Sequence, residues 1–164
     1  MTPRELLAHK AAPKRLKEIP TFRSQKRNKL PRPFKGLGGP RIFSTGMLEV
    51  SDDHMILMFW RTGETLTDTA FFGHLMCRLS TGSLSPIFEF HWHPNHKGFH
   101  CKTPCNTEGN YTDRQLPGAP ELNIKTPSIL DPRNDTDRLQ LVLIFCKACG
   151  ISLPDSDSDS QRLW

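Results

Sequence analysis

The sequence predicts a small α+β domain with a mostly antiparallel sheet and one main C-terminal helix, preceded by an extended basic N-terminal arm. Three observations lead to this prediction. Short apolar segments separated by turn residues run through the middle of the chain, a helical apolar stripe follows Asn134, and residues 1–41 hold most of the positive charge. The 164 residues correspond to about one domain.

The N-terminal arm, residues 1–41, is strongly basic. It contains twelve Lys or Arg and two acidic residues, so it carries +10, whereas the rest of the chain carries −5. Thr2 and Glu5 flank Pro3 in a capping-box pattern that predicts a helix start, and Pro13 predicts that this helix is short. The Pro-, Gly- and Lys/Arg-rich stretch that follows favours an extended backbone without a packed element.

The body, residues 42–153, begins with strand signals. The continuous apolar run Met55–Trp60 is bounded by polar turn residues and predicts a buried strand. A second apolar segment, Thr69–Leu79, fits either a strand or a helix. Its Cys77 is interpreted as a small buried hydrophobe, which is the usual role of an isolated cysteine.

The segment Ile87–His93 alternates with the period of a β-strand. One side of this strand carries three aromatic residues, which predicts a core face. These residues are Phe88, Phe90 and Trp92. The pleat then places Ile87, Glu89, His91 and His93 on the opposite face.

The main helix is predicted after a cap at Asp135-Thr136, and Gly150 predicts its end. Its apolar stripe follows the i, i+3, i+4 rule. The stripe consists of Leu139, Val142, Leu143, Cys146 and Cys149. The acidic, Ser-rich residues 154–164 are typical of a disordered tail.

The segment from His91 to Cys105 is the predicted location of any chemistry, because four of the seven histidines lie there within ten residues. One hypothesis is a metal site in which His91 and His93 share a strand face and a third ligand comes from His96, His100 or Glu89. Any single histidine of this segment also fits a solvent-exposed loop position.

A second hypothesis is a structural zinc ribbon. Two close cysteine pairs in an intracellular chain are typical of a closed zinc site, so we expect zinc as the cofactor. The four ligands would be Cys101, Cys105, Cys146 and Cys149. The alternative for the second pair is simple burial, because both cysteines also fit the core stripe of the main helix.

A third hypothesis is general acid–base catalysis on a phosphodiester. Histidine accepts and donates protons near neutral pH, and a nearby cation stabilises charge that develops on phosphate. The candidate catalytic residues are His91, His93, His96, Lys97 and His100.

The basic arm predicts binding to nucleic acid, with RNA preferred over DNA, because spaced cations neutralise phosphates without reading sequence. Phe22 and Phe34 lie between these cations and could stack on bases. The candidate residues are Lys14, Arg15, Arg23, Lys26, Arg27, Lys29, Arg32 and Lys35. An acidic protein partner is an alternative for the same segment. A membrane surface is not favoured, because no long amphipathic helix accompanies these charges.

Together these patterns favour a small nucleic-acid-associated protein with a zinc-binding His/Cys site. A ribonuclease of the toxin or defence kind is the alternative, and a structural subunit of a larger assembly is a further one. The odd number of cysteines, five, and the lack of a secretory signal predict an intracellular, cytoplasmic protein.

Overall fold

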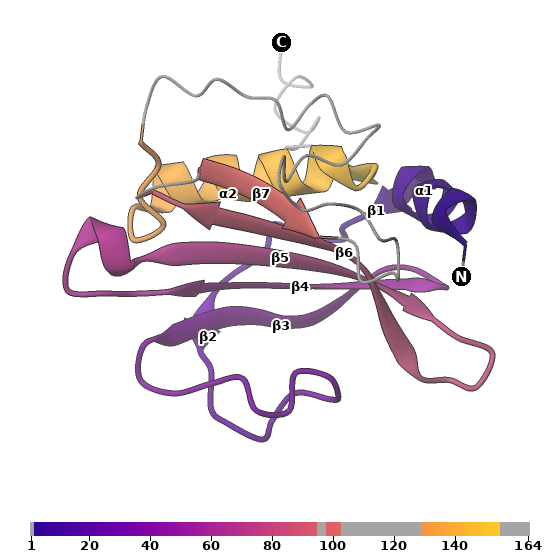
Figure 1. The fold of residues 1–164 in the computed structure, drawn as a ribbon, viewed down its shortest axis with the longest axis horizontal. Coiled ribbons are helices and arrows are strands. Elements are labelled where there is room, and N and C mark those ends of the chain that lie inside the picture. The colour runs from indigo at the N-terminus through magenta and orange to yellow at the C-terminus, as the bar shows by residue number, and fades with distance from the viewer. Residues whose placement is uncertain (1, 95–97, 103–128, 155–164) are drawn as a thin grey trace, which may run out of the picture.

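The computed structural model describes residues 2–94, 98–102 and 129–154 and shows an α+β fold (Figure 1), which confirms the predicted class. An antiparallel six-stranded sheet has the order β2-β3-β4-β5-β6-β7, and β1 and β8 form a separate parallel pair. The elements are α1 (Pro3–Ala11), β1 (Lys14–Arg15), β2 (Arg23–Ser24), β3 (Ile42–Ser51), β4 (His54–Arg61), the 3-10 helix η1 (Leu66–Asp68), β5 (Ala70–Arg78), β6 (Leu84–His93), β7 (Gly98–Lys102), α2 (Asp135–Ala148) and β8 (Ile151–Ser152).

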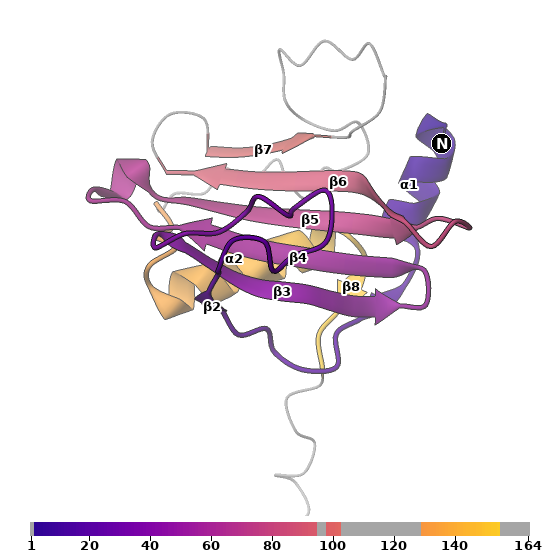
Figure 2. The ribbon, with the colours of Figure 1, turned by 90° about the horizontal axis from the view of Figure 1, so that it is seen from below.

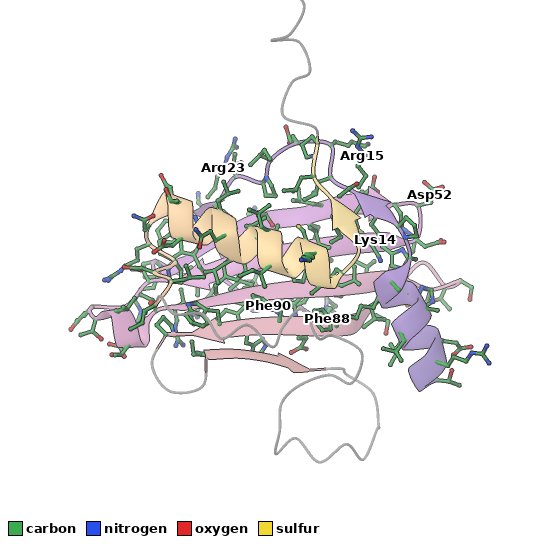
Figure 3. The ribbon with its side chains drawn as sticks, turned by 90° about the horizontal axis from the view of Figure 1, so that it is seen from above. Lys14, Arg15, Arg23, Asp52, Phe88 and Phe90 are labelled. Atoms are coloured by element: carbon green, nitrogen blue, oxygen red, sulfur yellow. The ribbon has the colours of Figure 1, made fainter. Side chains whose placement is uncertain are left out.

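The helix α2 lies across one face of the sheet (Figures 1 and 3) and closes the main core. Asn134, one residue before the predicted cap, accepts hydrogen bonds from the backbone N–H groups of Thr136 and Asp137. The predicted stripe is partly wrong, because Leu139 and Leu143 are exposed. The helix instead buries a neighbouring stripe with the same spacing, consisting of Leu141, Val142, Phe145, Cys146 and Ala148.

Strand β6 has the two faces that its alternation predicts. Phe88 and Phe90 (Figure 3) are buried in the core together with Trp92. The indole N–H of Trp92 donates a hydrogen bond to the carbonyl oxygen of Leu130 at 2.8 Å. Ile87 was expected on the opposite face, but it belongs to the same core. The ladder between β5 and β6 shifts register next to Ile87, and such an irregularity turns a residue out of the strict alternation.

The opposite face of the sheet is partly covered by the loop between β2 and β3, which lies across the strands in Figure 2. This loop contributes Leu30, Phe34 and Leu37 to a second apolar cluster with Leu57 and Phe59. The basic segment forms turns and packs against the body, which corrects the expectation of an extended backbone without a packed element.

The beginning of the arm is also packed. Thr2 and Glu5 form the predicted capping box of α1. Leu6 of α1 and Leu16 after β1 belong to the main core. No helix among the described residues combines the length and the apolar character needed to cross a membrane.

Candidate functional site

Three side chains from three elements converge where α1 meets the sheet. His54 begins β4 and is the ladder partner of Cys77 on β5, so both residues lie on the face that also packs against the helices. His9 reaches them from the last turn of α1. His9 Nδ1 lies 3.0 Å from His54 Nε2 and 3.8 Å from Cys77 Sγ.

These distances resemble the edges of a tetrahedral metal site. With metal–nitrogen bonds of about 2.0–2.1 Å and metal–sulfur bonds of about 2.3 Å, neighbouring ligand atoms lie roughly 3.3–3.6 Å apart. The ligand atoms of His9, His54 and Cys77 all lie within 4.8 Å of one another, close enough to hold a metal ion. Among the described residues, this is the one group of His, Cys, Asp or Glu with that property.

The surroundings of His54 favour a neutral imidazole. Its Nδ1 lies 2.8 Å from the hydroxyl oxygen of Ser51, which leaves Nε2 directed toward His9. Burial, with smaller contributions from the positive charges of Lys14 and His9, lowers the pKa of His54 to about 4. A neutral imidazole is the form that binds a metal, and a second hydrogen-bonding group on its other nitrogen fixes the orientation of the ring.

Cys77 supplies the sulfur. The residue is buried, as predicted, and burial together with the nearby Asp53 raises the pKa of its thiol. A bound divalent cation deprotonates a coordinating thiol and so overcomes this preference for the neutral form. The Cys77 sulfur contacts the imidazole of His9 and lies within 4.8 Å of the His54 nitrogen, in addition to packing in the apolar core.

The sequence patterns did not identify this group. Residues 9, 54 and 77 lie far apart along the chain and form no local motif. The register between β4 and β5 is the one feature that indicates this group, because it places His54 opposite Cys77. A hairpin register is not readable from apolar segments whose boundaries are uncertain by a few residues.

The predicted histidine cluster lies elsewhere, at the other face of the sheet. His91 and His93 are on β6, opposite to the aromatic core residues, and His100 of β7 is the ladder partner of His91. His96 and Lys97 lie outside the described residues.

Glu89 lies between two histidines on this face. Its Oε2 is 3.3 Å from His91 Nε2, and its Oε1 is 4.0 Å from His74 Nδ1. His74 belongs to β5 and was not recognised in the sequence, because a single histidine within an apolar strand carries no motif. The described residues thus show a carboxylate that contacts two buried imidazoles.

The cysteines predicted to form a zinc ribbon are in different surroundings. Cys146 of α2 and Cys149 at its C-terminal cap lie in the main core, with exposed fractions of 1% and 0%. Burial raises the pKa of the Cys146 thiol to about 12, as it raises that of Cys77, and the burial of both cysteines of this pair fits the alternative of simple core packing. Cys101 belongs to β7 and is the ladder partner of Phe90, and Cys105 lies outside the described residues.

Lys14 is wrongly placed among the phosphate-binding candidates, because it is 4% exposed. Its ammonium donates hydrogen bonds to the carbonyl oxygens of Lys10, Ala12 and Cys149, at 3.0, 2.6 and 2.9 Å. These carbonyls lie at the ends of α1 and α2, where helices leave acceptors without intrahelical partners. Lys14, which pairs with Ile151 as the first residue of β1, therefore joins the two helix ends (Figure 3).

The other predicted phosphate-binding residues are exposed. They are Arg15, Arg23, Lys26, Arg27, Lys29, Arg32 and Lys35. The two aromatic residues among them are only half-exposed, because Phe22 packs against Phe71 and Phe34 against His74. Their packing corrects the expectation that Phe22 and Phe34 are available to stack on bases.

Comparison of the chain with protein-family models, with curated proteins and with solved structures gave no significant match.

Proposed function

We propose that this protein binds zinc through His9, His54 and Cys77. The observation that carries the proposal is the convergence of two imidazole nitrogens and one sulfur at 3.0 and 3.8 Å, from a helix and two strands. Nitrogen and thiolate ligands suit zinc, whereas calcium and magnesium prefer oxygen ligands. Three protein ligands leave one coordination position of a tetrahedral ion for water or for a further ligand.

A metal at this position would connect α1 to the sheet. His9 belongs to the helix, whereas His54 and Cys77 are held by the β4–β5 ladder. Two ligands are thus pre-positioned by backbone hydrogen bonds, and the third orders the helix when it binds. Because binding energy at a structural site contributes to folding energy, zinc should raise the thermal stability of the whole domain.

The test is the zinc content of the purified full-length chain, measured by elemental analysis, together with its unfolding temperature with and without a chelator. We expect one zinc per chain, a lower unfolding temperature after chelation, and recovery on addition of zinc. Cobalt in place of zinc should give the thiolate-to-cobalt charge-transfer absorption that a sulfur ligand produces.

Cys77→Ala should abolish the tight zinc and the cobalt–thiolate absorption. Cys146→Ala is the matched control, because Cys146 is also a buried cysteine but belongs to α2 and lies outside the group. If Cys77→Ala does not fold, the cobalt spectrum of the unsubstituted chain still tests for a thiolate ligand. Zinc that is lost from Cys146→Ala and retained by Cys77→Ala would contradict the proposal and favour the ribbon.

We further propose that the loop between β2 and β3 binds RNA. The observation that favours it is charge: no acidic residue occurs between Glu18 and Glu49, and the loop cations are exposed. Leu30 and Phe34 anchor the loop on the sheet, so the cations are presented by an ordered surface. An ordered surface loses less conformational entropy on binding than a flexible tail does.

Salt dependence tests this second proposal. A variant in which Lys26, Arg27, Lys29, Arg32 and Lys35 are all changed to Gln should bind single-stranded RNA much more weakly. Its plot of log affinity against log salt should be shallower, by roughly 0.7 for each phosphate contact that is lost. The control is Lys17→Gln with Lys147→Gln, which removes exposed charge elsewhere. An unchanged slope in the loop variant would contradict the proposal, and equal affinity for DNA would contradict the preference for RNA.

A further inference from the structure

The face of the sheet opposite α2 carries a second group of ionisable side chains. Glu89, His91 and His93 follow one another at every second position of β6, and His74 lies beside them on β5. Glu89 contacts both His91 and His74 through its two carboxylate oxygens. The ring centroids of His91 and His93 are 6.1 Å apart.

We infer that His91 and His93, with Glu89 as a positioning residue, form an acid–base site that cleaves RNA. This inference rests on the proposal that the neighbouring loop binds RNA. The substrate class is single-stranded RNA, with His91 as the base, His93 as the acid and Glu89 as the residue that positions His91.

Glu89 determines which histidine acts as the base. The Glu89 carboxylate oxygen Oε2 lies 3.3 Å from His91 Nε2, so the two groups form an ion pair when His91 takes up a proton. The carboxylate also stabilises the imidazolium that forms when His91 takes a second proton, as an orienting carboxylate does in hydrolytic triads. His91 is buried, with 11% of its side chain exposed, whereas Glu89 keeps 25% exposure and His93 is half-buried, so the group reaches solvent chiefly through Glu89 and His93.

His93 is placed to act as the acid. It is two residues further along β6, half-buried, on the same side of the strand. Two imidazoles whose centroids lie 6.1 Å apart can contact opposite sides of one phosphoryl group, because each needs a single hydrogen bond of about 2.6–3.2 Å. Phe72 contacts both rings and helps to fix their orientation.

The basic loop adjoins this group. Phe34 of the loop packs edge-on against the ring of His74, with centroids 4.8 Å apart. Arg32 and Lys35 are exposed on either side of Phe34 in the sequence. A strand of RNA held by these cations would therefore run next to the histidines, and one of the cations can stabilise the negative charge that develops on phosphorus.

The reaction needs no metal or co-reactant. His91 removes the proton from a ribose 2′-hydroxyl, and the 2′-oxygen forms a bond to the adjacent phosphorus. The bond between phosphorus and the 5′-oxygen breaks, and protonated His93 donates its proton to that oxygen. The products are a 2′,3′-cyclic phosphate and a 5′-hydroxyl, and the proton gained by His91 returns to His93 through solvent.

The experiment uses the full chain, saturated with zinc, and three oligonucleotides of one sequence: RNA, DNA and 2′-O-methyl RNA. We expect cleavage of the RNA alone, with 2′,3′-cyclic phosphate termini. His91→Gln and His93→Gln should each lower the rate at least a hundredfold, the usual contribution of an acid or base. Circular dichroism verifies that each variant is folded.

Glu89→Gln is the test of the positioning role, and Glu49→Gln, an exposed glutamate of β3, is its matched control. We expect Glu89→Gln to lower the rate and to change the shape of the pH–rate profile, and Glu89→Asp to restore part of the rate. Among the described side chains, the titratable groups beside His91 are Glu89 and His93 on its own strand and His74 on β5, and His100 is its ladder partner on β7. The profile is therefore also measured for His74→Gln and His100→Gln. A purely structural Glu89 would change the unfolding temperature and leave the profile of the folded protein unaltered.

The outcomes separate the two proposals. If the 2′-O-methyl RNA binds and the RNA stays intact, the acid–base inference is wrong and the RNA-binding proposal stands. If neither oligonucleotide binds, both are wrong. Cleavage of DNA at a comparable rate, or cleavage that survives His91→Gln in a folded protein, would overturn the mechanism.

Discussion

His54 and Cys77 are partners across the β4–β5 ladder, and their side chains lie on the same face of the sheet. The two-residue turn Asp52–Asp53 connects β3 to β4, which begins at His54. Arg78, the residue after Cys77, donates its backbone N–H to the carbonyl oxygen of Asp53. The backbone thus fixes two of the three proposed zinc ligands before α1 supplies His9. A metal site of this kind depends on tertiary register and not on a local motif.

The pKa of His54 predicts how the stability of metal-free protein depends on pH. In the unfolded chain the imidazole titrates near 6.5, and in the folded protein near 4, so the unfolded state binds more protons between these values. The contribution of neutral His54 to the free energy of unfolding is therefore fully present above pH 6.5. It decreases by about 2–3 kcal/mol as the pH falls toward 4. Urea unfolding at several pH values, in the presence of chelator, measures this pH dependence of the free energy of unfolding. His54→Gln should remove this part of the slope, and a slope identical to that of the original chain would contradict the assignment.

Lys14→Met should destabilise the protein by about 3 kcal/mol, because three carbonyl oxygens at the helix ends lose a charged donor. Burial lowers the pKa of Lys14 to about 8, so the side chain is still mostly protonated at neutral pH. Lys17→Met, at an exposed lysine three residues later, is the control and should change stability by about 0.5 kcal/mol or less. Denaturant unfolding of both variants decides whether Lys14 belongs to the fold, as the structure shows, or to a solvated charged surface.

Local patterns predicted those parts of the fold that depend on neighbouring residues. The alternation along β6 identified Phe88, Phe90 and Trp92 as a core face, and the capping box identified the start of α1. Ile87 and the stripe of α2 were misplaced, because a register shift and the rotation of a helix about its axis are decided by the packing partner. Leu141 and Leu143 look alike in sequence, yet the first is fully buried and the second is exposed.

The candidate site was less predictable for the same reason. A count of cations could not distinguish Lys14, buried between two helix ends, from Arg15, which is exposed at the next position. A count of histidines located His91 and His93 but missed His74, which is brought to them by the β5–β6 ladder. Composition identifies which chemistry is available, whereas strand register determines which groups meet.

The packing of the loop between β2 and β3 predicts a link between stability and RNA binding. Leu30 is 8% exposed and belongs to the second apolar cluster. Leu30→Ala removes no charge, but it should cost about 2–3 kcal/mol and loosen the loop. We expect RNA affinity to fall several-fold while the salt slope stays close to that of the original chain, as measured by titration at several salt concentrations. Unchanged affinity would mean that an ordered loop is not required.

The two faces of β6 should respond to substitution in opposite ways. Trp92 is 5% exposed, packs in the main core and donates a hydrogen bond to Leu130, whereas His93 is half-buried on the other face. Trp92→Ala should therefore destabilise the protein by about 3–5 kcal/mol, because a large aromatic side chain leaves a cavity.

His93→Ala should cost about 1 kcal/mol, because His93 is only half-buried and loses mainly its edge contact with the ring of Phe72. It should nevertheless remove RNA cleavage while leaving zinc content unchanged, since His93 is not one of the three proposed zinc ligands. Thermal unfolding, elemental analysis and a cleavage assay on the same two preparations give all three readouts. If His93→Ala unfolds the protein and Trp92→Ala does not, the assignment of the two faces is wrong. If His93→Ala loses zinc and remains folded, the metal lies at the histidine-rich face and not at His9, His54 and Cys77.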